Sequence, residues 1–142
     1  KLSDFDRDSP LSEEGHKRAI SLTEYLQSVP IDLVITSRFQ RSQQTAAPLC
    51  SSKNLEAQIL TTDPKSIAAY ALMKTKQVAL IVGHVDTVTD IVEQLSSKQM
   101  TPPSYSDYDN IWVVVSEEAH FGELLHFNFQ SDEFLKFCAR HF

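Results

Sequence analysis

Arginine and histidine recur at three places in this sequence where a buried strand is predicted to end. Ser37 and Arg41 follow the first apolar run, and His84 follows a later one. Arg140 and His141 follow the last apolar run. A guanidinium group presents a planar fork of donors that matches phosphate oxygens, and an imidazole can donate to an oxyanion or attack phosphorus. Together, these residues predict chemistry on a phosphoryl group.

Each of these residues also has a structural interpretation. Arg41 would then be a solvated charge near a helix start, His84 a hydrogen-bonded histidine at a strand end, and the Arg140–His141 pair a frayed terminus. His84 and Asp86 could form half of a metal site, but no third ligand stands at a suitable spacing. We therefore expect neither a metal nor a cofactor. The other histidines are interpreted as structural or surface residues: His16, His120 and His126.

Strands and helices alternate along the chain and would position these residues. Helices are predicted over 12–28, 39–49, 64–73 and 87–95, and strands over 31–36, 58–61, 78–82, 111–115 and 124–129. This alternation predicts an α/β three-layer sandwich, with a mostly parallel central sheet, helices on both faces and a late antiparallel edge. The uninterrupted apolar run at 78–82 predicts a strand in the middle of that sheet. Ligands of such sheets bind beyond the carboxyl ends of the strands, where the arginines and histidines fall.

Length and composition are typical of one globular domain spanning 1–142. The 142 residues include 42% hydrophobic residues and carry a net charge of −6. This charge argues against a nucleic-acid partner, and the absence of an apolar run of membrane-spanning length argues against a membrane. Cys50 and Cys138 are interpreted as buried thiols in a reducing cytoplasm, with a disulfide as the less favoured alternative. Because the first residue is not Met, a removed leader stays open.

Four segments resemble the histidine phosphatase (phosphoglycerate mutase-like) superfamily, in its small phosphohistidine-phosphatase-like branch. They are Thr-Ser-Arg-Phe-Gln-Arg-Ser-Gln-Gln-Thr-Ala at 36–46, Leu-Ser-Glu-Glu-Gly at 11–15, Leu-Ile-Val-Gly-His at 80–84 and Tyr-Asp-Asn-Ile-Trp-Val-Val at 108–114. The resemblance implies a phosphoglycerate mutase-like fold. It also implies that Arg41, with Ser37, binds phosphate and that His84 is the second, hydrogen-bonding histidine of the site.

The chain departs from that family at its defining motif, an Arg-His pair that ends the first strand. The sequence opens where this pair would just have ended, whereas its last residues, 134–142, read as an apolar run into Arg140 and His141. Joining Phe142 to Lys1 would restore the continuous motif. We therefore predict a circular permutation in which 134–142 forms a central strand. The alternative is a truncated domain with a coincidental Arg-His tail.

The resemblance, with this permutation, implies a two-step phosphoryl transfer. His141 would attack phosphorus and form a phosphohistidine that water then cleaves. Arg140, Arg41 and His84 would hold the oxygens on which charge develops.

A general acid must also protonate the leaving oxygen. Asp86 is the predicted acid, although it could equally be a helix cap. Asp4 or Asp6 in the opening loop is the alternative.

The function predicted from these residues is hydrolysis of phosphate monoesters or phosphoprotein side chains. The alternatives are a phospho-ligand binding domain without turnover and a phosphomutase. A mutase is disfavoured because the segment between Leu60 and Val78 has no room for a large enclosing insertion. The expected partner is a phosphorylated small molecule or a phosphoprotein. The segment 104–110 is interpreted as either a specificity loop or a turn.

Overall fold

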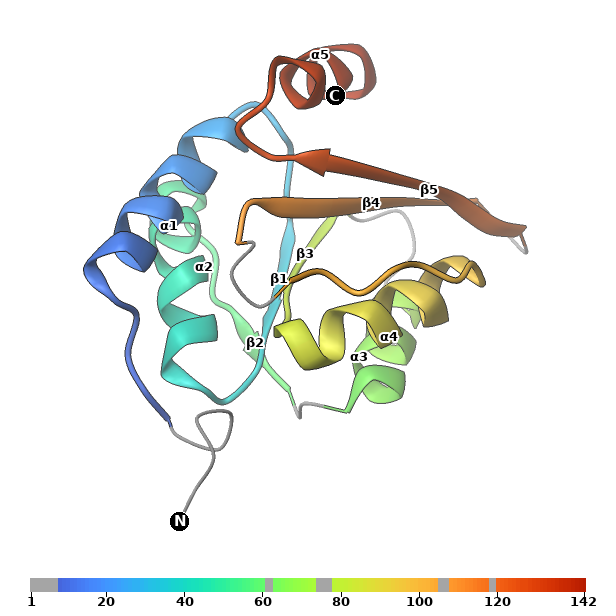
Figure 1. Ribbon diagram of the computed structural model, residues 1–142. Coiled ribbons are helices and arrows are strands. Elements are labelled where there is room, and N and C mark those ends of the chain that lie inside the picture. Colours follow the sequence, from blue (N-terminus) through green and yellow to red (C-terminus); the bar gives the residue numbers. More distant parts are fainter. Residues whose placement is uncertain (1–7, 61–62, 74–77, 105–107, 118–119) are drawn as a thin grey trace.

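A computed structural model describes residues 8–60, 63–73, 78–104, 108–117 and 120–142 (Figure 1). Its elements, in chain order, are α1 (Glu13–Tyr25), β1 (Leu33–Thr36), α2 (Gln40–Lys53), β2 (Gln58–Ile59), α3 (Pro64–Met73), β3 (Ala79–Val82), α4 (Val85–Ser96), β4 (Asn110–Glu117), β5 (His120–Asn128) and α5 (Asp132–His141). The predicted helices and strands up to β5 are confirmed, with ends shifted by a few residues. Asp4 and Asp6 lie outside the described residues.

Strand β1 forms the middle of a parallel sheet with the order β2-β1-β3, while β4 and β5 form a separate antiparallel pair. Alternate residues of β1 face opposite sides. Val34 packs in one apolar cluster with residues of α1, α2 and α5, and Leu33 and Ile35 pack in another with residues of α3 and α4. Helices therefore cover both faces of the sheet (Figure 1), as the predicted three-layer sandwich requires. None of the described helices is both long and apolar enough to cross a membrane.

The prediction that residues 78–82 form the middle strand is wrong. The buried middle strand is β1, whereas β3 pairs with β1 along one edge, and no other described strand pairs with it. Ala79 is exposed, and Leu80, Ile81 and Val82 are half-buried. An apolar run predicts burial of the faces of a strand, but it does not fix the strand's place in the order.

The prediction of a strand over residues 134–142 is also wrong, because α5 is a helix. The Ser131 hydroxyl accepts a hydrogen bond from the Phe134 N–H at 3.2 Å and so caps its first turn. Phe134, Phe137 and Cys138 lie at helical spacing and are buried. The permuted central strand is therefore not formed.

Candidate active site

The carboxyl ends of β1 and β3 bring together Ser37 and His84. The two strands are parallel neighbours with Thr36 opposite Val82, so the residues that follow them emerge side by side. Ser37 Oγ and His84 Nε2 are 2.6 Å apart, a short hydrogen bond. Two of the predicted site residues are thus in direct contact at the strand ends, where ligand-binding residues of such sheets are expected.

A second serine, Ser42, fixes this contact in place. Its hydroxyl donates to the Val82 carbonyl at 2.9 Å and accepts from the Ser37 N–H at 3.1 Å. Ser42 thus ties the turn after β1 to the end of β3, and it is only 2% exposed. Satisfied buried polar networks of this kind hold a site in one geometry. Sequence reasoning missed Ser42, although it stands beside Arg41 in the segment that resembles the family.

Ser37 holds the ring of His84 in place. Its Oγ accepts a hydrogen bond from the Phe39 N–H at 3.3 Å and is hydrogen-bonded to His84 Nε2. The direction of this second bond depends on which imidazole nitrogen carries the proton. Because Ser37 is only 2% exposed, we assign its hydroxyl to holding His84 rather than to contacting a phosphate.

Two arginines and His84 lie around the buried ring of Phe39. The guanidinium carbons of Arg38 and Arg41 lie 4.4 and 4.8 Å from the ring centroid, and the His84 ring meets it edge-on at 5.4 Å. Burial lowers the pKa of His84, and the positive charge of Arg41 lowers it further, whereas Asp86 opposes the shift. His84 is therefore an uncharged hydrogen-bond donor at neutral pH.

Asp8 is a neighbour of the site that the sequence analysis did not single out. Its carboxylate accepts a hydrogen bond from the Gln40 N–H at 2.7 Å, at the amino end of α2. The Gln40 side chain donates in turn to the Asp8 carbonyl at 3.0 Å. A carboxylate is favoured at a helix amino end. Asp8 thus holds the chain segment before α1 next to the first turn of α2, which contains Arg41.

The structure separates the remaining predicted residues. Asp86 is exposed in the first turn of α4, close enough for its charge to act on His84. Arg140 and His141 lie instead in the last turn of α5, where His141 Nδ1–H donates to the Phe137 carbonyl at 2.9 Å.

Helix α5 lies at the amino end of β1, away from the site (Figure 1). Gln130, just before α5, is consistent with this placement, because its side chain donates to Ser21 Oγ and its carbonyl accepts from the Tyr25 hydroxyl, both on α1. The expected meeting of His141 with Arg41 and His84 therefore does not occur. Within the described residues, no group of three or more His, Cys, Asp or Glu residues could hold a metal ion.

Comparisons with known proteins agree with this geometry. Residues 4–62 match the model of the histidine phosphatase superfamily (branch 1). The structure of the protein histidine phosphatase SixA, complexed with tungstate, superposes with a TM-score of 0.70 at 23% identity, covering 91% of this chain and 90% of SixA. A phosphohistidine phosphatase SixA, described as putative, from Nakamurella multipartitia gives a TM-score of 0.49 at 24% identity, covering 68% of this chain and 58% of its own. No curated protein matches the chain.

The shared fold is that of the small phosphoglycerate mutase-like α/β sandwiches. The chain thus shares the fold of SixA, and its residues 4–62 are similar to the histidine phosphatase superfamily.

Proposed function

We propose that this chain is a phosphatase-type domain that holds a phosphoryl group between Arg41 and His84. The observation that carries the proposal is the 2.6 Å contact of Ser37 with His84 at adjacent strand ends, with Arg41 beside it on the Phe39 ring. In open α/β sheets this is the place where ligands bind. The family match covers the segment that supplies Ser37 and Arg41.

Arg41 and His84 would carry out different parts of the binding. The Arg41 guanidinium would hold two phosphoryl oxygens through its planar fork and compensate their charge. Neutral His84 would donate its imidazole N–H to an oxygen on which charge develops in the transition state. Asp86, exposed near His84, stays the proposed general acid for the leaving oxygen.

The proposed substrate is a phosphate monoester or a phosphorylated protein side chain. The solved relative with the same fold is a protein histidine phosphatase, and its structure was determined with tungstate, a tetrahedral oxyanion like phosphate. We therefore propose that tungstate binds at Arg41 and His84 in this chain too.

Binding without turnover is the second candidate function. The position of α5 favours it, because His141, the predicted nucleophile, lies on a helix at the other end of the sheet. The residues that the structure gathers at the site can hold an oxyanion, but none of them is a second histidine that could accept the phosphoryl group.

Phosphate release from an aryl phosphate tests the first candidate, and calorimetric titration with tungstate tests both. Arg41→Ala and His84→Ala should each lower kcat/KM about a hundredfold or more, because each removes a contact to developing charge. His141→Ala, on α5, is the matched control and should keep the wild-type rate.

Tungstate binding without any phosphate release would select the binding-only function. Neither binding nor release would contradict both candidates. Loss of activity in His141→Ala, with its fold intact, would contradict the assignment of α5 to a structural role.

A further inference from the structure

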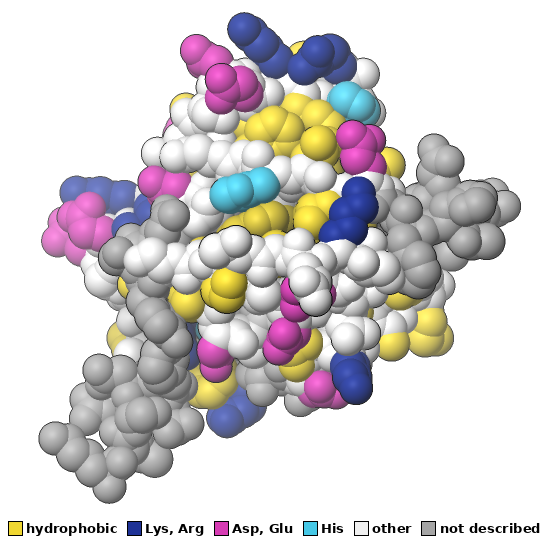
Figure 2. Space-filling model, turned by 45° about the vertical axis from the view of Figure 1, so that its right-hand side comes forward, with side chains coloured by type: hydrophobic (Ala, Val, Ile, Leu, Met, Phe, Trp, Pro, Cys, Tyr) yellow, Lys and Arg dark blue, Asp and Glu magenta, His cyan; other side chains and the backbone are white. Residues whose placement is uncertain are grey.

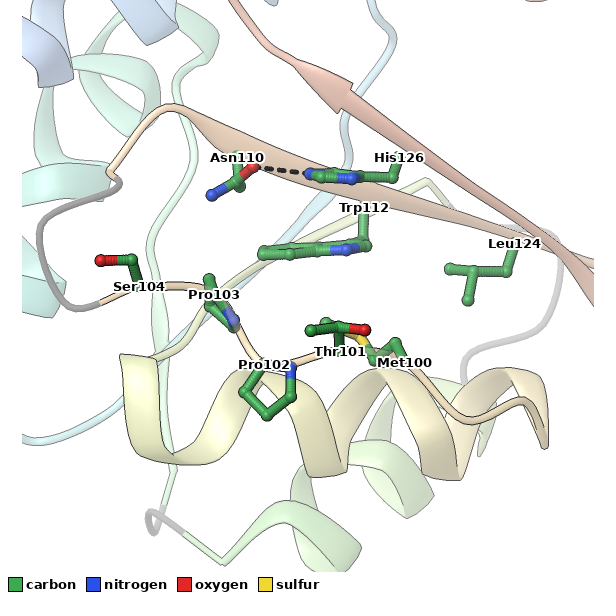
Figure 3. Close-up of a pocket in the computed structure, with 9 residues that line it drawn as sticks. All are labelled: Met100, Thr101, Pro102, Pro103, Ser104, Asn110, Trp112, Leu124 and His126. Atoms are coloured by element: carbon green, nitrogen blue, oxygen red, sulfur yellow. Dashed lines mark hydrogen bonds between the residues drawn. The ribbon is translucent and has the colours of Figure 1, made fainter.

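A hollow separate from the strand-end residues lies between β4–β5 and the segment that follows α4 (Figure 3). Its volume is about 510 Å³, within the range of small-molecule sites. On the face shown in Figure 2, hydrophobic side chains reach the surface beside a histidine. The hollow is lined by Met100, Thr101, Pro102, Pro103, Ser104, Asn110, Trp112, Leu124 and His126.

One wall of the hollow is a rigid aromatic platform. Trp112 of β4 and His126 of β5 are paired across the two strands, and their rings stack at 4.8 Å with an angle of 7°. Asn110 Oδ1 lies 2.6 Å from His126 Nε2, which fixes the imidazole in the stack. A ring held on paired strands in this way loses little entropy when a ligand packs against it.

The opposite wall is formed by the segment 100–104 and is anchored to α4. Pro102 and Pro103 limit the backbone freedom of this segment. The Met100 N–H donates to the Glu93 carboxylate at 3.1 Å, and the Lys98 N–H donates to the Ser96 hydroxyl at 3.2 Å. In Figure 3 the prolines lie across the hollow from the Trp112 ring. The two walls thus form a slot with an aromatic side and a proline side.

Trp112 lies on the face of the strand pair that is turned toward α4. The alternate face, with Ile111, Val113 and Phe127, packs against the core. Both strands contact α4, and the hollow lies on this side, between Trp112 and Leu124 and the segment 100–104. Among the described residues, no Lys, Arg, Asp or Glu lines the hollow. Its chemistry therefore suits a flat, uncharged ring.

We propose that this hollow binds a flat, uncharged aromatic ring carried by the substrate, and so selects aryl over alkyl phosphates. The segment 100–104 runs back along α4 toward its amino end, where His84 is the N-cap (Figures 1 and 3). A substrate with its phosphate at Arg41 and His84 would extend its ring along this path toward Trp112. This inference rests on the proposed function for its phosphate end, but the binding of a ring can be measured without it.

Two measurements test the inference. The first compares kcat/KM for 4-methylphenyl phosphate and butyl phosphate in the wild type and in Trp112→Leu. The aryl-to-alkyl ratio should fall about threefold to tenfold, the size of one lost ring stack, while the rate on butyl phosphate stays unchanged. Ile20→Ala, an exposed hydrophobic position on α1, is the matched control and should keep the ratio.

The second measurement needs no phosphatase activity and no variant. Trp112 is the single tryptophan of the chain, so its indole N–H gives one assignable NMR signal. Titration with 4-methylphenol should shift this signal saturably, and cyclohexylmethanol, which is not flat, should not. A saturable shift without hydrolysis of either phosphate would keep the ring site and overturn the proposed function. An unshifted signal, or an unchanged ratio in Trp112→Leu, would overturn the inference.

Discussion

The imidazole of His84 is held by Ser37, a serine that is almost fully buried. Ser37→Ala would leave His84 Nε2 without its 2.6 Å partner. We expect the balance between the two His84 tautomers to change, which the imidazole ¹⁵N chemical shifts report directly. Phosphatase activity should fall about threefold to tenfold, the size of one hydrogen bond.

Ser28→Ala, at an exposed position outside the site, is the control for that experiment and should change neither quantity. Identical imidazole ¹⁵N shifts in the wild type and in Ser37→Ala would contradict the role assigned to Ser37.

The lowered pKa of His84 also predicts how stability depends on pH. Burial and the Arg41 charge hold this pKa below its ordinary value of about 6.5. Just below pH 6.5 the unfolded chain therefore binds a proton that the folded chain does not yet bind. The free energy of unfolding then decreases as the pH falls from about 6.5 toward the folded-state pKa.

His84→Gln removes the titrating group and should flatten that part of the stability curve, measured by urea unfolding at a series of pH values. His16→Gln, at an exposed position on α1, should leave the slope as it is in the wild type. An equal slope in wild type and His84→Gln would show that other groups cause the dependence.

At the scale of the element, α5 should act as a core helix rather than as part of the active site. Phe134 is 2% exposed and packs near Phe127, whereas Leu135, the next residue, is 42% exposed. Phe134→Ala should lower the free energy of unfolding by about 3–5 kcal/mol. Leu135→Ala should change it by much less, because its side chain is exposed and packs little in the core. Urea unfolding curves measure both, and equal effects would contradict the packing of α5.

The sequence of α5 contained enough information to predict a helix. Phe134, Phe137 and Cys138 recur at three and four residues, and Ser131 stands at the capping position. The resemblance of Arg140–His141 to a family motif outweighed these local signals. For β1, periodicity and the strand-end rule were sufficient, because its apolar residues and the polar residues after it are adjacent in sequence.

Other parts of the site depend on contacts that periodicity does not encode. The bond from Ser42 to the Val82 carbonyl joins residues 40 positions apart. The Trp112–His126 stack depends on the register of β4 with β5, which the sequence did not fix. His126 was accordingly interpreted as a structural or surface residue, whereas its ring lines the hollow.

At the scale of the whole molecule, one apolar cluster joins elements from both ends of the chain. It contains Val34 of the middle strand together with Cys50 of α2 and Cys138 of α5. Both cysteines are free and buried, as predicted, and burial raises the pKa of each thiol. Because α2 and α5 share this cluster, we expect them to lose their packing in the same unfolding event.

Thiol labelling measures whether this event involves the whole molecule. A buried thiol reacts only when the structure around it opens, so the labelling rate of each cysteine reports its own opening. Cys50→Ala and Cys138→Ala isolate one thiol each, and the two labelling rates should agree once each is corrected for the stability of its variant. Both rates should rise together with urea. If Cys138 instead reacted much faster than Cys50, α5 would open independently of the sheet, and the stability contributed by Phe134 would be local to α5 rather than shared with the site.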